Sequence, residues 1–344
     1  MRQRLRRLRL SARLHLTRAV GIGLTIVFLV LALQRVDLAA LGDELRSVNY
    51  VWIVPSAACT LIGYVLRTLR WRLILSGAAR APLGTLFPVL MMGFATNNLL
   101  PGRLGEFWRA YLLGRKRGVP KSSALASVVV ERVFDGLTLI ALLALVSMAI
   151  PLPGWSRQVE LVAIAVFASA SLVVVVLLAQ PALVLAVVHQ LLRPLPATAA
   201  AFVELRLTAF VDGLGSLRRL PVLLGATGLS AGVWLFELSS YLLLSRGVAL
   251  GLPAAFEVPG IGLALVTINF GIMVPSGPGY LGTQEFFGTA ALGVVNANPQ
   301  AALVLVAVSH VVQYVLVTGL GLLFFAREQL SPRDLRPSLV EEPA

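Results

Sequence analysis

Long apolar stretches, separated by short polar and basic segments, run through almost the whole chain. A helix needs about 20 apolar residues to cross a bilayer, and several stretches reach that length. Two further stretches, near 84–100 and 258–275, run directly into Pro-Gly sequences. The pattern predicts an all-α polytopic membrane protein with about six full transmembrane helices and two interrupted ones. The six full helices are expected near 19–36, 49–66, 122–150, 158–180, 222–245 and 300–326.

Each interrupted stretch ends in the motif Pro-Gly-x-Leu-Gly followed by a carboxylate. The motif begins at Pro101 and again at Pro278, and the carboxylates are Glu106 and Glu285. Proline lacks an N–H and glycine holds the backbone loosely, so both end helices. Broken backbone inside a bilayer is tolerated only where it is buried in protein or lines a wet cavity, and paired breaks point to a transporter-type site. The expected structural breaks are Pro101, Gly102, Gly105, Pro275, Pro278, Gly279 and Gly282.

The distribution of Lys and Arg indicates whether the two interrupted stretches cross the membrane. If all eight stretches cross with the N-terminus inside, the inside segments carry 16 Lys and Arg and the outside segments carry 12. If the two are re-entrant hairpins, the counts become 24 and 4, which is the bias that cytoplasmic segments show. We therefore predict two re-entrant hairpins and cytoplasmic termini. This layout puts 67–80 in a cytoplasmic loop, leaves only Arg132 inside a span, and makes 181–221 an interfacial helical connection.

In this layout the two halves of the chain are inverted relative to each other. The spacing from Pro101 to Pro278 is 177 residues, and the spacing from Pro120 to Pro299 is 179 residues. A near-constant offset supports a duplication, and inverted repeats with paired broken helices are an architecture of secondary transporters. The predicted organisation is a basic cytoplasmic tail (1–18), one transmembrane domain (19–326, with repeats at about 49–150 and 222–326) and a cytoplasmic tail (327–344).

Composition supports a membrane protein and excludes other classes. The 344 residues are 58% hydrophobic and 13% charged, with a mean hydropathy of +0.86, which no soluble globular domain sustains over its whole length. The net charge of +13 comes from basic residues between apolar stretches, where they orient helices rather than bind nucleic acid. A single cysteine, Cys59, and three dispersed histidines indicate no disulfide framework and no metal cluster. We expect no metal and no cofactor.

Charged side chains inside the apolar stretches are the candidate chemistry, because each costs at least about 2.5–3.5 kcal/mol at the bilayer centre. Glu131 and Asp135 share a helix face, and Arg132 can reach Asp135. At about 1.5 Å per residue from Ser122, Glu131 lies roughly 14 Å deep, near mid-bilayer. The residues predicted to bind or translocate a substrate are Asn97, Asn98, Arg103, Glu106, Arg109, Glu131, Arg132, Asp135, Glu285 and His310.

Arginine suits a phosphate because its planar fork of donors keeps its charge when desolvated. The alternative is that these arginines only neutralise the carboxylates so that the helices can pack. His310 occupies the repeat position of Glu131, and Tyr314 that of Asp135. A hydrogen-bonded packing residue and a titratable group both remain open for His310. Glu237 has no evident partner in the sequence, so packing in a protonated form and proton coupling are equally open.

Two strings resemble the signatures of a known family. They are NNLLPGRLGEFWRAYLLGRKRGVPKSSALASVVVERVFDGLTL at 97–139 and VPSGPGYLGTQEFFGTAAL at 274–292. They resemble the lysylphosphatidylglycerol synthase transmembrane-region family, also called flippase-like or uncharacterised-family-0104 membrane proteins, over roughly 20–326. The resemblance carries over the residues Arg103, Gly105, Glu106, Glu131, Arg132, Asp135, Pro275, Pro278, Gly279, Gly282 and Glu285.

The resemblance implies a bacterial or archaeal inner-membrane protein. In bifunctional relatives this region is thought to flip an aminoacylated phospholipid that a separate cytosolic domain makes, and no such domain is evident here. Stand-alone relatives are linked to polyprenyl-phosphate, cardiolipin or hopanoid biology. We therefore expect a flippase for an anionic or aminoacylated phospholipid or a polyprenyl-phosphate-linked lipid, with a lipid synthase or glycosyltransferase as partner. The alternatives are a lipid-modifying enzyme with Glu131 or Glu285 as base, and a non-catalytic scaffold for envelope lipid assembly.

Overall fold

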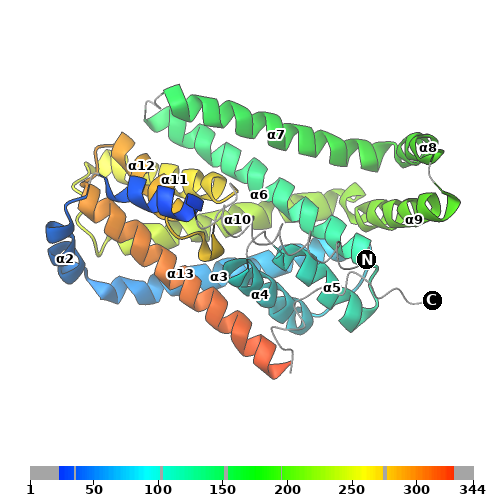
Figure 1. Cartoon of the computed structure of the whole chain (residues 1–344), viewed down its shortest axis with the longest axis horizontal. Coiled ribbons are helices and arrows are strands. Elements are labelled where there is room, and N and C mark those ends of the chain that lie inside the picture. The colour runs from blue at the N-terminus through cyan, green and yellow to red at the C-terminus, as the bar shows by residue number, and fades with distance from the viewer. Residues whose placement is uncertain are drawn as a thin grey trace, which may run out of the picture.

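A computed structural model describes residues 23–34, 36–100, 104–150, 154–194, 196–273 and 277–328. These residues form helices joined by short connections, and none of them lies in a strand (Figure 1). The predicted N-terminal tail lies outside the described residues, as do 329–344 and the predicted site and break residues Pro101, Gly102, Arg103 and Pro275.

The helix boundaries follow the apolar stretches closely, with one exception described below. The helices are Gly23–Leu33, α2 (Leu38–Ser47), α3 (Ile53–Leu75), α4 (Leu83–Leu99), α5 (Gly105–Arg117), α6 (Lys121–Ala149), α7 (Gly154–Ala179), α8 (Pro181–Leu192), α9 (Ala197–Gly213), α10 (Leu220–Ser245), α11 (Ala254–Gly271), α12 (Thr283–Val294) and α13 (Pro299–Arg327), with short 3-10 turns η1 (Tyr50–Trp52), η2 (Gly215–Arg218) and η3 (Pro278–Tyr280).

Several helices are suited to cross a membrane. Within the described ranges, four are long and apolar enough: Tyr50–Leu75, α10, α11 and α13. A fifth span results if the pair formed by α7 and α8, bent by 102°, counts as one. The prediction of an all-α polytopic membrane protein is confirmed. The exact number of spans stays a prediction, since length and composition alone do not distinguish a span from a hairpin arm.

The long helices α6 and α13 begin with local signals that the sequence shows. α5 ends at Gly118, whose φ of 65° lies in the left-handed region, and α6 begins directly after Pro120. α13 begins at Pro299, where the missing N–H costs nothing. The Asn298 side chain accepts hydrogen bonds from two backbone N–H groups of its first turn. Both helices have 29 residues and therefore rise about 43 Å.

The two interrupted stretches fold back as helical hairpins, α4 with α5 and α11 with α12. Both returning helices are too short to cross, because their 13 and 12 residues rise about 20 and 18 Å against a hydrocarbon core of about 30 Å. The arms approach closely: a Cβ on Gly105 would lie 1.9 Å from the carbonyl oxygen of Gly93, and one on Gly271 would lie 2.1 Å from the ring of Phe287. Figure 1 shows the two hairpins toward opposite ends of the long axis.

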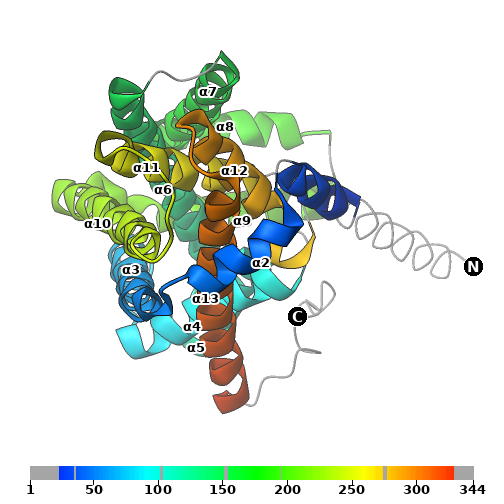
Figure 2. The same ribbon diagram turned by 90° about the vertical axis from the view of Figure 1, so that its left-hand side faces the viewer.

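The helices of the two halves pack on each other in matching pairs. α3 lies along α10, α4 packs on α13, and α11 packs on α6. Within each half, the returning arm packs on the long helix that follows it, α5 on α6 and α12 on α13. The end-on view in Figure 2 shows α3 beside α10 and α13 near the middle of the bundle. This is the packing that two related halves would give, and the inverted duplication itself stays a prediction.

The segment between the halves is helical and lies at the periphery. α7 packs on α6, α8 follows it after the sharp bend, and α9 returns to pack on α6 (Figure 1). Gly213 at the end of α9 lies against Ser123, where a Cβ would come within 2.8 Å of the Ser123 Cα. The helical character expected for 181–221 is therefore confirmed.

Candidate functional site

A cavity of about 220 Å³, lined by polar, charged and apolar side chains, lies where the second break approaches the end of α4. η3 packs on α4, and a Cβ on Gly279 would lie 3.7 Å from the carbonyl oxygen of Asn98. We call this space the central cavity. Its lining comprises Tyr64, Arg67, Phe94, Asn97, Asn98, Glu106, Arg132, Asp135, Gly136, Leu139, Phe167, Trp234, Glu237, Asn269, Ile272, Met273, Tyr280, Gln284, His310, Gln313, Tyr314 and Val317.

The assignment of 67–75 to a cytoplasmic loop is wrong, whereas 76–80 do form a non-helical connection. α3 continues to Leu75, so Arg67 and Arg70 lie inside a helix and are buried. In the sequence, the charges of Arg67 and Arg70 end the apolar stretch at residue 66. In the structure, carboxylates of other helices compensate these charges. The i,i+3 spacing of Arg67 and Arg70 on one helix face was the available signal. The correction moves these two arginines into the protein interior, and the charge bias toward one side of the membrane survives it.

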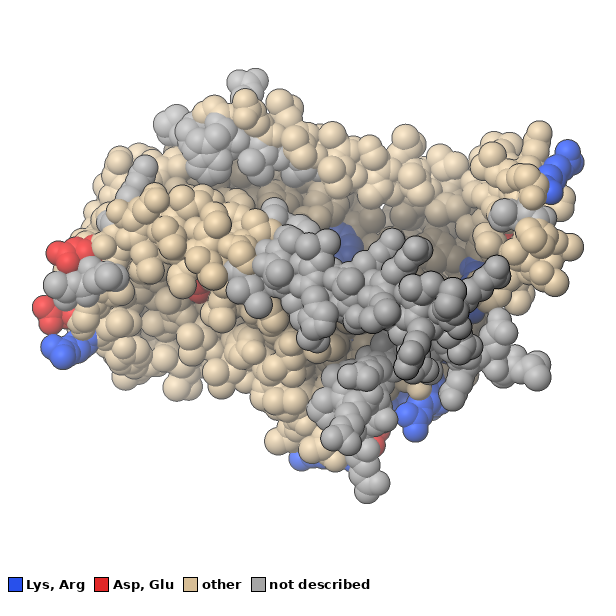
Figure 3. Space-filling view, in the orientation of Figure 1, with Lys and Arg blue, Asp and Glu red and all other residues tan. Residues whose placement is uncertain are grey.

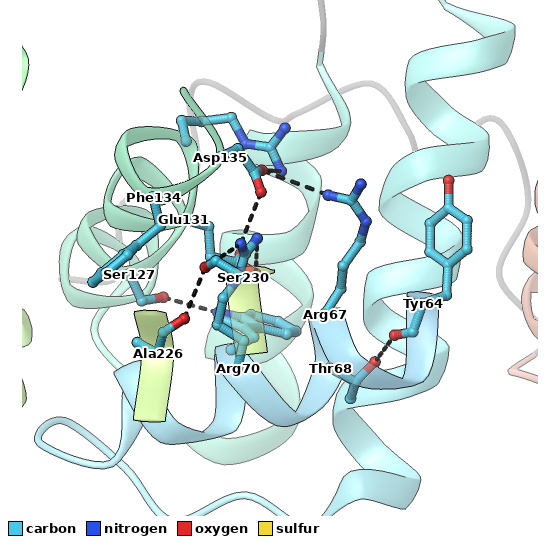
Figure 4. Close-up of polar contacts among 12 residues, drawn as sticks. Tyr64, Arg67, Thr68, Arg70, Ser127, Glu131, Phe134, Asp135, Ala226 and Ser230 are labelled. Atoms are coloured by element: carbon cyan, nitrogen blue, oxygen red, sulfur yellow. Dashed lines mark hydrogen bonds and ion pairs between the residues drawn. The ribbon is translucent and has the colours of Figure 1, made fainter. Parts of the chain in front are cut away.

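An inner ionic network lies behind the central cavity. Arg70 donates hydrogen bonds of 2.8 Å to Asp135 and to Ser230, and its guanidinium is 3.8 Å from Glu131. Arg109 donates a bond of 2.6 Å to the other oxygen of Glu131. The side chains of Arg70 and Glu131 are almost completely buried. Figure 4 shows the carboxylate of Asp135 facing the guanidinium groups of Arg67 and Arg70.

Arg109 belongs to this inner network rather than to the cavity wall. Its side chain is 2% exposed, and its guanidinium lies 4.1 Å from the centre of the Trp71 ring. The aliphatic part of Arg109 lies against Gly93 on the opposite arm of the first hairpin. The pair of Arg109 with Glu131 joins α5 to α6, as the alternative of arginines that neutralise carboxylates would have it. A contact between Arg109 and a ligand in the cavity would require the Glu131 pair to open.

Two of the described arginines face the central cavity, and each lies between two carboxylates. Arg67 is 3.6 Å from Asp135 and 3.9 Å from Glu237. Arg132 is 3.3 Å from Asp135 and 3.8 Å from Glu106. Neither side chain makes a hydrogen bond to any residue that the structure describes, and the buried Nε atom of each has no hydrogen-bond partner there. Unbonded buried donors cost about 1–3 kcal/mol each, so these guanidinium groups are suited to receive an anionic ligand.

Aromatic rings hold Arg67 in place. Its guanidinium carbon lies 5.1 Å from the Trp234 ring centre and 5.8 Å from that of Tyr64, within the range of cation–π attraction.

Together the cavity wall and the inner network bring four arginines against four carboxylates. These are Arg67, Arg70, Arg109 and Arg132 with Glu106, Glu131, Asp135 and Glu237.

The predicted asparagines line the cavity but also have structural partners. The Asn97 side chain accepts a 2.7 Å hydrogen bond from the Gly105 N–H at the start of α5. Asn98 donates a bond of 3.0 Å to Thr318 on α13. Glu237, which had no evident partner in the sequence, accepts a 2.8 Å bond from Gln313 and faces Arg67. These partners are distant in sequence, so a single sequence does not reveal them.

The second half contributes a histidine–carboxylate pair. His310 on α13 lies 2.7 Å from Glu285 through Nδ1 and 2.7 Å from the carbonyl oxygen of Gly279 through Nε2. The other oxygen of Glu285 accepts a 2.7 Å bond from the Gly282 N–H. Gly279 and Gly282 have φ values of 73° and 77°, which glycine adopts without strain. A contact between a returning arm and the long helix that follows it thus recurs here.

A second, mostly apolar space adjoins the central cavity. It has a volume of about 580 Å³, and we call it the apolar groove. The end of α11 separates the two spaces: Asn269, Ile272 and Met273 face the central cavity, whereas Phe270 and Gly271 face the groove. The groove is lined by Leu31, Ala32, Gln34, Val36, Thr267, Phe270, Gly271, Phe286, Phe287, Thr289, Ala290, Gly293, Ala297, Pro299 and Ala302.

A pair of rings lies on the α7 side of the central cavity. Phe167 of α7 packs against Gly136 of α6, where a Cβ would lie 1.9 Å from the Phe167 ring. The ring of Phe167 is 6.1 Å from that of Phe270 on α11. Phe167 lines the central cavity and Phe270 lines the groove, so this pair stands between the two spaces.

Comparison with known proteins identifies the family. The family model for the lysylphosphatidylglycerol synthase transmembrane region matches residues 18–321. The chain belongs to the lysylphosphatidylglycerol synthase transmembrane-region family. The resemblance inferred from the two signature strings is therefore confirmed. No solved structure matches the chain.

Several curated proteins resemble part of this family member. The glycosyltransferase AglD of Haloferax volcanii is 30% identical over 150 residues, which are 42% of this chain and 24% of AglD. Two UPF0104 membrane proteins of Methanothermobacter thermautotrophicus are 33% and 37% identical over 138 and 139 residues. The matches cover 39% and 37% of this chain and 40% and 39% of those proteins. The matched region thus spans less than half the length of each of these relatives.

The signature residues of the family fall into two groups in the structure. Glu106, Arg132 and Asp135 line the central cavity, whereas Glu131 lies in the inner network behind it. The signature glycines Gly105, Gly279 and Gly282 lie at close approaches between chain segments. Arg103 and Pro275 lie outside the described residues.

Proposed function

We propose that this chain translocates a lipid with a phosphate-bearing headgroup across the membrane. The observation that carries the proposal is the pair Arg67 and Arg132. Both guanidinium groups face a polar cavity between two helix breaks, and neither is hydrogen-bonded to a described residue. Arginine presents a fork of donors that matches phosphate oxygens. The substrate class is an anionic or aminoacylated phospholipid, or a lipid linked to polyprenyl phosphate.

The apolar groove supports a lipid rather than a water-soluble anion. Its volume lies within the range of about 300–1,000 Å³ found for ligand sites. It flanks the same end of α11 as the central cavity, so one molecule places its headgroup in the cavity and a hydrocarbon chain in the groove when the end of α11 and the Phe167–Phe270 pair move apart. Movement of the two halves against each other would then expose the headgroup alternately to the two leaflets.

The charge distribution supports an orientation with α5, α8 and α9 at the cytoplasmic side. Lys and Arg side chains gather at the end of the molecule that carries these helices, whereas acidic side chains and fewer basic ones lie at the end that carries α2 (Figure 3). Cytoplasmic segments carry the excess of Lys and Arg. We propose the prokaryotic cytoplasmic membrane as the location, with a lipid synthase or a glycosyltransferase as the partner that supplies or uses the lipid.

The geometry supports a lipid-modifying enzyme less well. Glu131, one of the two candidate bases, is held by Arg109 and Arg70 and does not line the cavity. Glu285, the other candidate, is bonded to Gly282 and His310. A general base must reach the proton that it abstracts, and both carboxylates are already occupied by protein groups.

The test is transbilayer movement of lipid in vesicles that contain the purified protein. Fluorescent phosphatidylglycerol, lysyl-phosphatidylglycerol and polyprenyl phosphate are placed in one leaflet, and their exposure to an impermeant quencher is followed over time. We expect faster movement of at least one of them than in protein-free vesicles, and loss of the effect in Arg67→Ala and Arg132→Ala. Arg46→Ala, at an exposed ion pair on α2, is the matched control. Equal movement with and without folded protein, for all three lipids, would contradict the proposal.

A further inference from the structure

His310 fastens the second helix break at two points. Its Nε2 atom contacts the carbonyl oxygen of Gly279, within the break, and its Nδ1 atom contacts Glu285, at the start of α12. Glu285 in turn accepts a hydrogen bond from the N–H of Gly282. The three contacts form a closed loop that joins α13, the break and α12. His310 is 6% exposed and Glu285 is 8% exposed, and the exposed part of His310 faces the central cavity.

Counting donors shows how many protons this loop holds. A carbonyl oxygen only accepts, so the hydrogen between Nε2 and Gly279 must belong to His310. The contact between Nδ1 and Glu285 also needs a hydrogen, which resides either on the imidazole or on the carboxyl group. In both cases the pair carries one proton more than a neutral imidazole with an ionised carboxylate. This count does not depend on which of the two groups holds the proton.

We propose that Glu285 and His310 form a binding site for one proton, and that the bound proton fastens the second helix break to α13. When the proton leaves, the Nδ1 lone pair faces the ionised oxygen of Glu285, and the two repel. The imidazole then has to turn, and it loses its contact with Glu285 or with Gly279. Release of the proton therefore loosens the break, and uptake fastens it again.

The surroundings give the proton a route to and from the pair. His310 lines the central cavity, so the exchange partner is in that cavity or in water that enters it. Among the described residues, the other ionisable side chains around the pair and the central cavity are Tyr280 of η3, Tyr314 of α13, Tyr241 and Glu237 of α10, Tyr64 and Arg67 of α3, Glu106 of α5, and Arg132 and Asp135 of α6.

The first helix break has no equivalent loop among the described residues. There the Gly105 N–H bonds to the amide oxygen of Asn97, which does not titrate. Glu106, which follows that break, faces Arg132 instead of a histidine. The two breaks therefore differ in their response to protons although their sequences match. Leu104 and Leu281 occupy the same place in the two motifs, and both are exposed, so they serve as matched reporters.

The experiment measures the accessibility of both breaks as a function of pH. Single cysteines replace Leu281 or Leu104 in a Cys59→Ala background, and their reaction with N-ethylmaleimide is followed in nanodiscs. The Leu104→Cys protein corrects for the pH dependence of the thiol itself. We expect the labelling ratio of Leu281→Cys to Leu104→Cys to rise several-fold as the pH increases through the deprotonation of the pair. A ratio that stays constant over the pH range in which the protein is folded would overturn the proposal.

Glu285→Gln tests the role of the proton directly. The glutamine amide donates to Nδ1 as a protonated carboxyl group would, but it cannot release a proton. The fold should therefore persist, the labelling ratio of Leu281→Cys to Leu104→Cys should stay at its low-pH value, and the rise with pH should disappear. A rise of the same size in Glu285→Gln would contradict the proposal.

Nitrogen-15 spectra of labelled histidine provide a second measurement. His310 is assigned by its loss in His310→Gln, and His189, whose exposed side chain contacts Glu204, is the internal reference. We expect Nε2 of His310 to carry a hydrogen at neutral pH, and an unprotonated Nε2 there would contradict the donor count. A role of this proton in transport rests on the proposed lipid movement. The labelling experiment and the spectra need no lipid substrate, so they test the proton site separately from the lipid movement.

Discussion

Arg109 and Glu131 lie 2.6 Å apart, and they join the first hairpin to α6 in a place where both side chains are almost completely buried. Removing one partner of such a pair costs about 3–5 kcal/mol, because the other charge stays buried without compensation. We expect Arg109→Ala and Glu131→Ala to lower the unfolding free energy by about that amount. Denaturant unfolding in detergent micelles, monitored by tryptophan fluorescence, measures it.

The control for this prediction is Arg46→Ala, which removes an exposed pair on α2 and should leave the unfolding midpoint unchanged. The double variant Arg109→Met with Glu131→Leu should recover part of the loss, because neither charge remains buried. If Arg109→Ala were as stable as the parent, the pair would not hold the hairpin.

Gly105 is the site of a second prediction, because it allows the arms of the first hairpin to touch. In Gly105→Ala the new Cβ would lie 1.9 Å from the Gly93 carbonyl oxygen, so the arms must separate. We expect a clear fall in the thermal midpoint of the purified protein. Gly84→Ala on α4 meets nothing within 4 Å, so it should keep or slightly raise the midpoint. Equal midpoints for the two variants would argue against close contact of the arms.

Arg67 and Arg70 lie one turn apart on α3 and should respond differently to substitution. Arg70 is fully buried and bonded to Asp135 and Ser230, so Arg70→Ala should cost about 3–5 kcal/mol of stability. Arg67 faces the cavity without a hydrogen bond to a described residue, so Arg67→Ala should fold but lose lipid movement. Unfolding curves and the vesicle assay, run on both variants, check the contrast. Full lipid movement in Arg67→Ala would remove this residue from the proposed site.

A fourth prediction concerns the ring pair Phe167 and Phe270. Phe167→Ala opens the α7 side of the central cavity, so a cysteine at the cavity-lining position Asn269 should react faster with a small thiol reagent. The measurement uses Asn269→Cys in the Cys59→Ala background. Phe202→Ala, an exposed ring on α9, is the control. An unchanged reaction rate with intact folding would show that the ring pair does not limit access.

The sequence predicted the helices well and the ionic network only in part. Apolar run length and the Pro-Gly motifs locate the helices and both hairpins, because these features depend on neighbouring residues. Glu131, Arg132 and Asp135 are conspicuous because they lie within one apolar stretch. Arg67 and Arg70 were missed, because nothing near them shows that distant carboxylates compensate their charge.

The same limit applies to roles within the site. Arg109 was predicted to contact the substrate, but the structure places it behind the cavity against Trp71. The three bonds around His310 depend on how α13 meets the second break. The repeat offset matched His310 with Glu131 but could not show these partners. Local patterns therefore identified the chemically important segments, and tertiary packing decides which side chains face the cavity.

Among the described residues, the central cavity and the inner network together hold as many arginines as carboxylates, and this balance has a consequence for the proposed lipid movement. In the proposed function, an incoming phosphate meets no excess of arginine over carboxylate among the described residues, so it has to displace Asp135 or Glu237 from Arg67, or Asp135 or Glu106 from Arg132. Binding of the phosphate then exchanges one counter-ion of the arginine for another. The carboxylate returns to the arginine when the phosphate leaves, and this return favours release. Such an exchange favours weak and quickly reversible binding of the phosphate, which the proposed lipid movement requires.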